Sequence, residues 1–437
     1  MSMTWPEFLA QRTGNPGAQL FRVPGATRTI MVCSHIWWTE QIGFAFLQSG
    51  FNVLMHPPLY TLYTDPNAFP KFDELWQGIL ANIHAVKVDY LLGGNTSAML
   101  VHPGTGELLH HAAHAQGRPV TLINWWWDEP RTRPPLARAG ISPAAFVRLL
   151  NDAATVNAIW DIDVLEELAA QLGLTNLVHL PLATLPEFWP HGFVPLEQRP
   201  LVACFLGHCH FTADWIENDA DPLHAWARQI VARKIAAPST PMQQLIAEET
   251  ATRQITLPQP ADDPGDAAWT SFARPMEVLN AAYMHTTRNQ LVKAAAAHLG
   301  GKLALIGKGW DKLGLRANME HAGDKSGIIY GQSQISLNLF GGCVHGGLPL
   351  RPYDIGASGG LIVTHDQREL PDLFEPGKEC LVFSNRDELI AQIDRIRAQP
   401  DAFNPVAQAG RQRVLAQHTW GHRIARLSAF LQSRQPS

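Results

Sequence analysis

The stretch from Ile335 to Thr364 constrains the fold most, because an apolar run, a glycine-rich loop and a helical segment follow one another in it. Residues 335–340 (ISLNLF) predict a buried strand. Four glycines follow in the loop: Gly341, Gly342, Gly346 and Gly347. Glycine at this position lets the backbone approach a ligand closely, and a helix that starts after the loop favours an anion at its N-terminus. The stretch predicts a βαβ unit that is suited to a phosphorylated sugar.

The same alternation of apolar strands and helices runs through the rest of the chain. In the first half we predict strands at residues 28–34, 51–56, 88–92, 119–125, 155–160 and 176–180, with helices at 38–50, 72–85, 106–116 and 162–172. The proline-rich segment 181–200 then interrupts the pattern, and a new strand at 201–206 begins a second unit. Alternation with short turns is typical of parallel sheets covered on both faces, so the fold class is α/β.

A chain of 437 residues, 46% of them apolar and 17% charged, is too long for one core and suits two globular domains. We predict a first domain at residues 1–195 and a second at 196–415. The Ala-rich region 211–284 reads as a helical insertion in the second domain. The remaining residues, 416–437, predict a C-terminal helix that packs back on the first domain.

Charge and cysteine content limit the partners and the compartment. Lys and Arg number 34 and Asp and Glu 39, which gives a net charge of −5 without a long basic block, so we expect no nucleic-acid partner. Five cysteines without metal-ligand spacing indicate free thiols in a reducing compartment, and the cytoplasm is the expected location. We expect neither a signal peptide nor a transmembrane segment.

Three motifs favour structural interpretations over cofactor or metal binding. The first predicted strand is followed by SHIWWTE, which lacks the glycine pattern of a dinucleotide-binding fold and disfavours a dehydrogenase. Asp161 and Asp163 imitate a D-x-D metal motif, but Asp161 stands where a helix cap is expected. His208 and His210, with two nearby cysteines, are crowded onto one strand end and lack zinc-ligand spacing. We therefore expect no metal and no cofactor.

The residues resemble the glycosyltransferases of the CgeB (spore-maturation-protein) type, which have the GT-B fold and relate to the group-1 glycosyltransferases. The matching segments are residues 335–340, 350–364, 369–383 and 409–423, with 123–130 and 157–184 in the first half. The resemblance implies two Rossmann-like domains that face each other across a cleft. It further implies a nucleotide-sugar donor on the second domain and an acceptor on the first.

In the group-1 relatives two glutamates flank the donor. Asp354 stands at the second of these positions, where the resemblance implies contact with the ribose hydroxyls. Gly347 stands at the first, so that carboxylate is missing. The alternative interpretation of Asp354 is a carboxylate that stabilises a helix start.

Basic and glycine residues around the loop complete the candidate donor site. Arg351 and Lys308 are candidates for the diphosphate, although each would also be ordinary in an ion pair or an exposed turn. Arg288 is a further phosphate candidate, and His345 lies in the glycine loop itself. The remaining candidates for donor binding are Tyr353, Gly307, Gly309, Gly346, Gly347, Gly359 and Gly360.

Three residues of the first half are candidates for the catalytic base. His35 follows the first predicted strand, and its ordinary pKa near 6.5 suits proton removal. Asp128 and Glu129 follow another strand end and compete for the same role. The tryptophan clusters at 37–38 and 125–127 fit either core packing or stacking on a sugar.

We therefore expect a metal-independent glycosyltransferase that moves a sugar from a nucleotide-diphosphate donor to a glycan, protein or small-molecule acceptor. Two alternatives remain open from the sequence. One is an epimerase or phosphorylase on the same fold, because a fold does not fix a reaction. The other is a non-catalytic protein that binds sugar nucleotides or glycans, which the missing carboxylate at Gly347 would allow.

Overall fold

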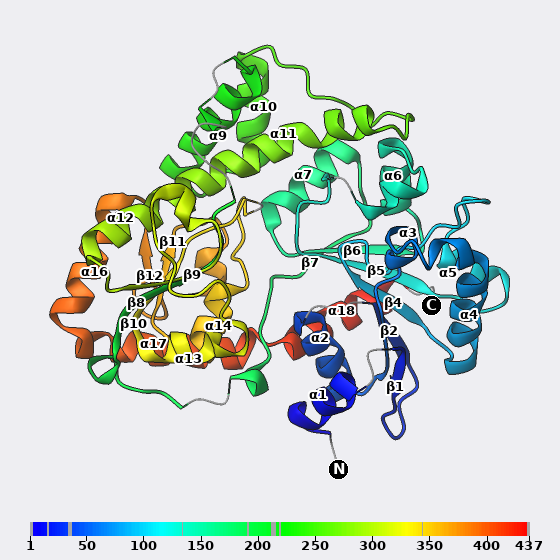
Figure 1. The fold of residues 1–437 in the computed structure, drawn as a ribbon, viewed down its shortest axis with the longest axis horizontal. Helices are drawn as coiled ribbons and strands as arrows, with labels where there is room; N and C mark the ends of the chain where they lie inside the picture. Colours follow the sequence, from blue (N-terminus) through cyan, green and yellow to red (C-terminus); the bar gives the residue numbers. More distant parts are fainter. Residues whose placement is uncertain are drawn as a thin grey trace.

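Two α/β domains lie side by side, and a group of helices bridges them at the top of Figure 1. The structure is a computed structural model. It describes residues 3–14, 17–33, 37–132, 134–189, 192–210, 216–217, 220–342 and 344–434. The expected α/β class, with two Rossmann-like domains and a helical insertion, is confirmed by the two sheets and by the helices around them.

The first domain contains a seven-stranded sheet. Its strands are, in spatial order, β1 (Gln19–Phe21), β3 (Asn52–His56), β2 (Thr29–Cys33), β4 (Tyr90–Gly94), β5 (Thr121–Trp126), β6 (Thr155–Ile159) and β7 (Leu177–His179). All neighbours pair in parallel except β1, which pairs with β3 in the antiparallel direction. We did not predict β1, because three residues are too few for a periodic pattern to identify a strand.

Helices cover both faces of this sheet. The helices of the first domain are α1 (Trp5–Gly14), α2 (Trp37–Gln48), α3 (Thr61–Thr64), α4 (Phe72–Val86), α5 (Leu109–Ala115), α6 (Pro143–Leu150) and α7 (Ile162–Leu172). Successive residues of β2 point to opposite faces, so that Ile30 and Val32 join one core and Met31 and Cys33 the other. An apolar run without alternation is therefore what a strand buried on both faces requires.

The second domain contains a five-stranded sheet in which every pairing is parallel. Its strands are, in spatial order, β12 (Leu381–Phe383), β11 (Ile362–His365), β10 (Ser333–Asn338), β8 (Leu201–Leu206) and β9 (Leu303–Ile306). Its helices are α12 (Gln290–Leu299), α13 (Ser326–Gln332), α14 (Arg351–Ala357), α15 (Leu370–Leu373), α16 (Arg386–Ala398) and α17 (Asn404–Gln417). The glycine-rich loop joins β10 to α14, as the sequence pattern predicts.

The helical insertion consists of α9 (Pro222–Ala236), α10 (Met242–Thr252) and α11 (Asp266–Met284). Although it belongs to the second domain in sequence, α10 contacts α7 and α11 contacts α6 of the first domain. Figure 1 shows these helices lying across both domains. A π-helical turn, His285–Asn289, joins α11 to α12.

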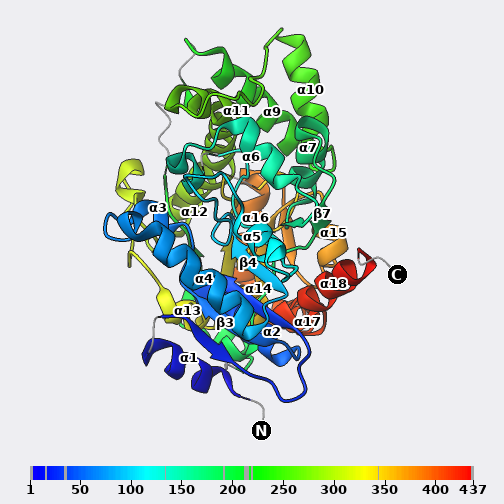
Figure 2. The ribbon, with the colours of Figure 1, turned by 90° about the vertical axis from the view of Figure 1, so that its right-hand side faces the viewer.

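The last helix, α18 (Trp420–Ser433), lies against the first domain, where Figures 1 and 2 both place it beside α2. The indole ring of Trp420 meets those of Trp125 and Trp127 edge to face, at centroid distances of 5.5 and 5.8 Å. Its Nε1 donates a hydrogen bond to Gln41 at 3.2 Å. Residues 125–127 are buried, so core packing is the role that the structure gives this tryptophan cluster.

The described residues contain no helix that is both long and apolar enough to cross a lipid bilayer.

Candidate functional site

The glycine-rich loop of the second domain lies against the first domain at Asp161, which follows β6. The Asp161 carboxylate accepts hydrogen bonds from the backbone N–H groups of His345, at 2.8 Å, and Gly346, at 3.0 Å. It also accepts one from the N–H of Asp163 at 2.9 Å, so the interpretation of Asp161 as the cap of α7 is confirmed. Burial, together with the Asp163 carboxylate, raises the pKa of Asp161. The C-terminal ends of the strands in the two sheets therefore face each other at this contact.

His345 fixes the middle of the loop. Its side chain is fully buried, with Nδ1 2.7 Å from Glu167 and Nε2 3.0 Å from the Oδ1 atom of Asn280 on α11. Burial opposes the charged imidazole, but the Glu167 carboxylate outweighs burial and raises the pKa of His345. A doubly protonated ring donates to both partners. The structure thus gives His345 a role in joining loop, first domain and insertion, and the predicted contact with a donor stays a prediction.

Gly346 and Gly347 are glycines because the loop approaches the first domain so closely. A Cβ atom on Gly346 would lie 2.6 Å from the carboxyl group of Asp163. A Cβ atom on Gly347 would lie 2.9 Å from Oε2 of Glu369 and 3.0 Å from the Cα atom of Asp161. A carboxylate side chain at position 347, which the resemblance would imply, could not be accommodated here without moving the loop.

A buried ion network reinforces the same contact. Asp163 receives the Lys234 ammonium of α9 at 2.6 Å and the Arg368 guanidinium at 2.5 Å. Both Asp163 and Lys234 have completely buried side chains, and Arg368 also pairs with Glu166 of α7 at 2.7 Å. These ion pairs therefore connect the first domain, the insertion and the second domain.

The loops that follow β8 and β9 pack on each other. Both strands are parallel to β10, so their carboxyl ends lie on the same edge of the sheet as the glycine-rich loop. Gly307 and Gly309 have φ angles of 141° and 80°, and a Cβ atom on Gly307 would collide with the carbonyl oxygen of Gly207. The backbone N–H of Lys308 donates to Nδ1 of His208 at 2.8 Å. These glycines serve the contact between the two loops.

Six basic side chains gather at these two strand ends, and we call them the cationic cluster. They are His208, His210, Arg288, Lys308, Lys312 and His321. Arg288, 8% exposed, donates to the carbonyl of His208 at 3.1 Å, whereas Lys308 and Lys312 are exposed. Burial and then the neighbouring cations lower the pKa of His208. One carboxylate, Glu320, pairs with Lys308 at 3.3 Å. The cluster is suited to an anion with several negative oxygens.

Arg351 supports the strand ends rather than projecting from them. Its Nε donates to the carbonyl of Leu206 at 2.8 Å, and its Nη1 to Asn338 at 2.9 Å and to the carbonyl of Leu339 at 3.0 Å. Its guanidinium also lies 5.0 Å from the ring centroid of Phe205. The predicted bidentate contact with a diphosphate stays a prediction, and the structure shows these donors already engaged with the protein.

Asp354 lies in the first turn of α14 but faces the segment that joins the two domains. Its Oδ1 accepts a hydrogen bond from Thr184 at 2.7 Å, and Thr184 accepts one from Nε1 of Trp189 at 2.7 Å. Burial raises the pKa of Asp354 to about 7, against the lowering effect of Thr184. The contact of Asp354 with a ribose stays a prediction, and it requires that the hydrogen bond between Asp354 and Thr184 first be broken.

The other predicted residues in and just after α14 are structural. Tyr353 is fully buried and packs against Phe374 and His418, so it has no surface to offer a donor. Gly359, with a φ angle of 74°, follows the helix end, and its carbonyl accepts a hydrogen bond from Arg199. A Cβ atom on Gly360 would lie 2.8 Å from the side chain of Ile355.

On the first domain, Asp128 is the exposed carboxylate at the strand ends. It follows β5, and its Oδ2 accepts a hydrogen bond from Nδ2 of Asn95 at 2.9 Å. Asn95 follows β4 and has a φ angle of 53°. Its Oδ1 accepts a hydrogen bond from the backbone N–H of Trp127 at 2.8 Å. Asn95 therefore orients Asp128. The other predicted base, His35, lies outside the described residues.

Glu129, the third predicted base, has a placement that contradicts this role. It is 3% exposed, and both of its oxygens accept hydrogen bonds from Arg131, at 2.6 and 2.9 Å. Burial would raise its pKa, but Arg131 outweighs burial and the pKa is lowered. A carboxylate that is enclosed and neutralised in this way neither reaches a substrate proton nor binds one readily.

One group of side chains in the described part of the chain has the spacing of metal ligands. It consists of His110 and His111 of α5 with Asp152, which precedes β6. The group belongs to the first domain and shares no residue with the glycine-rich loop or the cationic cluster.

Sequence reasoning missed Asn95, Lys312 and His321. Asn95 could have been found, because Gly93-Gly94-Asn95 at the end of a predicted strand is a turn in which Asn tolerates a positive φ. Lys312 and His321 carry no such indication. They are separated in sequence from Arg288 and His208, and only the fold brings them together.

The fold is that of a two-domain α/β protein, with a cluster of basic side chains at strand ends of the second domain and an exposed carboxylate, Asp128, at strand ends of the first. Residues 287–429 match the family described as "Glycosyl transferase-like". The match begins in the π-helical turn and ends in α18, which is less than half of the chain. The second domain is therefore similar to glycosyl transferases. No curated protein matches the chain.

Solved structures with a related course of the chain include several glycosyltransferases. Sucrose-phosphate synthase from Thermosynechococcus elongatus has 11% identity and a TM-score of 0.49, covering 93% of this chain and 100% of that one. A glycosyltransferase from Rickettsia africae has 9% identity and a TM-score of 0.49, covering 93% and 98%. Anabaena HepE in complex with UDP has 9% identity and a TM-score of 0.46, covering 93% and 100%.

Proposed function

We propose that the protein is a glycosyltransferase that moves a sugar from a nucleotide-diphosphate sugar to a hydroxyl or amide acceptor. The observation that carries the proposal is the cationic cluster at the ends of β8 and β9, most of which lies within the part of the chain that matches the glycosyl transferase-like family. A diphosphate offers several anionic oxygens, and a cluster of histidine, lysine and arginine side chains is their natural complement.

In this proposal the cationic cluster stabilises the leaving nucleotide. Charge develops on the diphosphate as the bond to the sugar breaks, and cations already in place favour that state over the ground state. Lys308 and Lys312 are exposed and can contact phosphate directly. Arg288, held by the carbonyl of His208, adds a fixed charge behind them. Side-chain cations in this role make a divalent metal unnecessary.

The acceptor lies on the first domain, where Asp128 is the described candidate for the base. It is exposed, and Asn95 holds one of its oxygens while the other remains able to accept a proton. His35 is a second candidate from the sequence. Four described cysteines, Cys33, Cys204, Cys209 and Cys380, are free thiols, which supports the proposed cytoplasmic location.

The test is calorimetric binding of UDP-, GDP-, dTDP- and CMP-sugars to the wild type and to the double variant Lys308→Gln/Lys312→Gln. Because both lysines are exposed, the variant should fold normally. We expect one donor to bind and its affinity to fall about tenfold or more in the variant, since each charge-assisted hydrogen bond contributes roughly 1.5–3 kcal/mol. Wild-type affinity should also fall as salt is raised.

The matched control is Lys302→Gln, which removes an exposed lysine of the same domain outside the cluster. It should bind the donor as the wild type does. Equal affinity in the double variant and the control would refute the diphosphate site. Release of free nucleotide with an acceptor present, undiminished by EDTA, is expected of the metal-independent transferase, and a strict requirement for a divalent cation would contradict it.

A further inference from the structure

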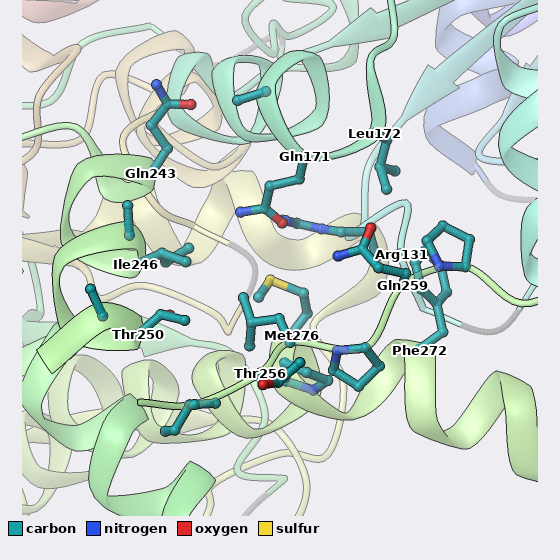
Figure 3. Close-up of a pocket in the computed structure, with 18 of the residues that line it drawn as sticks. Arg131, Gln171, Leu172, Gln243, Ile246, Thr250, Thr256, Gln259, Phe272 and Met276 are labelled. Carbon is teal, nitrogen blue, oxygen red and sulfur yellow. The ribbon is translucent and has the colours of Figure 1, made fainter. Parts of the chain in front are cut away.

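A pocket separate from these sites lies between α10, α11 and the end of α7, beside the segment that joins α10 to α11 (Figure 3). Its volume is about 820 Å³, within the range of small-molecule sites. It shares no residue with the cationic cluster or the glycine-rich loop. The proposed transfer reaction therefore assigns it no role.

The floor of this pocket is apolar and firmly packed. Phe272 and Met276 of α11 are 6% and 3% exposed, and Ile246 of α10 is 2% exposed. Figure 3 shows Met276 near the middle of the hollow. Pro275 adds a rigid apolar surface on the same helix. A ligand here would rest on a hydrophobic face.

The walls carry uncharged hydrogen-bonding groups, above all carboxamides. Five glutamines line the pocket: Gln171, Gln243, Gln244, Gln254 and Gln259. In Figure 3 the carboxamides of Gln171 and Gln259 extend into the hollow from two different elements. Thr250 and Thr256 add hydroxyl groups. Carboxamides and hydroxyls both donate and accept hydrogen bonds, so they match a ligand whose groups also do both.

The pocket offers almost no net charge to a ligand. Among the described residues that line it, Arg131 alone is ionic. Its guanidinium is neutralised by Glu129, at 2.6 Å, and by Glu167, at 2.6 Å, and its Nη1 donates to Gln171 at 2.8 Å. A phosphate or carboxylate ligand would find no available cation here, and a cationic ligand no available carboxylate.

From these features we propose that the pocket binds an uncharged carbohydrate of about disaccharide size. A sugar ring presents hydroxyls at its edge, which suit the glutamines and threonines, and C–H groups on its face, which suit Phe272 and Met276. A peptide that binds by adding a strand would instead be expected at an unpaired strand edge. This pocket is walled by helices and by the irregular segment at residues 254–260.

The test is saturation-transfer NMR with maltose, cellobiose, lactose and N,N′-diacetylchitobiose, without any nucleotide sugar. We expect at least one to bind with a dissociation constant near 1 mM or below, on the scale set by a few neutral hydrogen bonds. Glucose 6-phosphate should bind more weakly than the best neutral sugar. Because nucleotide is absent, the result is independent of whether the transferase proposal holds.

Two variants locate the binding. Ala251→Phe places a ring at the exposed rim on α10, and Gln259→Leu removes a carboxamide at similar volume. Each variant should lower the affinity for the best-binding sugar about tenfold or more, a loss comparable with that of one or two hydrogen bonds. Both residues are exposed, so thermal melting should match the wild type. The matched controls Ala398→Phe and Gln116→Leu, at exposed helix ends elsewhere, should bind normally.

Failure of all four disaccharides to bind at about 10 mM would overturn the proposal, because a site of this size should reach that range. It would equally be overturned if binding of the best sugar were unchanged in both pocket variants.

Discussion

At the scale of single residues, ionisation of the buried Asp354 carboxyl group is coupled to folding. Burial raises its pKa from an ordinary value of 3.8 to about 7. The folded state therefore holds its proton up to a higher pH than the unfolded chain does. Its contribution to stability is fully present below the unfolded pKa and is lost as the pH rises toward and through the folded pKa.

We predict that Asp354→Asn removes this pH dependence, because an amide cannot ionise. Between about pH 4 and pH 8 the wild type should lose roughly 2–4 kcal/mol of unfolding free energy relative to the variant, as the rise of the Asp354 pKa from 3.8 to about 7 implies. Urea denaturation of both proteins at several pH values measures the difference. Parallel stability profiles would show that the carboxyl group is not perturbed.

The residues also differ in how far sequence alone could assign them. Asp161 could be identified as a helix cap because capping is a local property. Glu129 could not be separated from Asp128 as a candidate base. The two are adjacent in sequence, but one is buried against Arg131 and the other is exposed beside Asn95. Only the packing of distant elements distinguishes them.

At the scale of elements, the glycine-rich loop depends on its close approach to α7. We predict that Gly346→Ala destabilises the protein by about 1–3 kcal/mol, as overpacking of a rigid site does. The new methyl group would lie 2.6 Å from the Asp163 carboxyl, which Lys234 and Arg368 hold in place. Thermal unfolding measures the effect.

Gly78→Ala is the matched control for that substitution. Gly78 lies within α4, and a Cβ atom there would meet no heavy atom within 4 Å. Alanine favours a helix over glycine by about 0.5–1 kcal/mol, so this variant should be slightly more stable than the wild type. If both variants were stabilised, the loop would not be as closely packed as described.

At the scale of the whole molecule, Asp163 joins three parts that are distant in sequence. We predict that Asp163→Asn costs about 3–5 kcal/mol, because it leaves the completely buried Lys234 ammonium without its carboxylate. Arg368 loses a partner as well. With this contact weakened, small-angle scattering should report a larger radius of gyration and proteolysis should cut more readily near the insertion.

The exposed pair Arg148–Asp262 provides the comparison, since it also joins the first domain to the insertion region. Its side chains are 66% and 78% exposed at an N–O distance of 3.1 Å. Asp262→Asn should therefore change the unfolding free energy by less than about 1 kcal/mol and leave the scattering profile unchanged. Similar effects of the two substitutions would mean that burial does not govern these contacts.

Local sequence patterns were sufficient to predict the α/β class, the course of most strands, the glycine loop and the helical insertion. Each of these depends on residues within one or two turns or strands, where periodicity, glycine and proline act locally. The short antiparallel strand Gln19–Phe21 was missed for lack of such a pattern. The placement of side chains between elements, by contrast, became visible only in the folded protein.

The cationic cluster, the Asp163 network and the glutamine-lined pocket each combine residues from segments far apart in the chain. The same holds for Asp354, which sequence placed at a donor and the fold places against Thr184. Burial, charge and hydrogen bonding between such segments depend on their final distances, and no local pattern encodes these. The sequence therefore determined where a site could be built, and the tertiary structure decided which side chains are available to act in it.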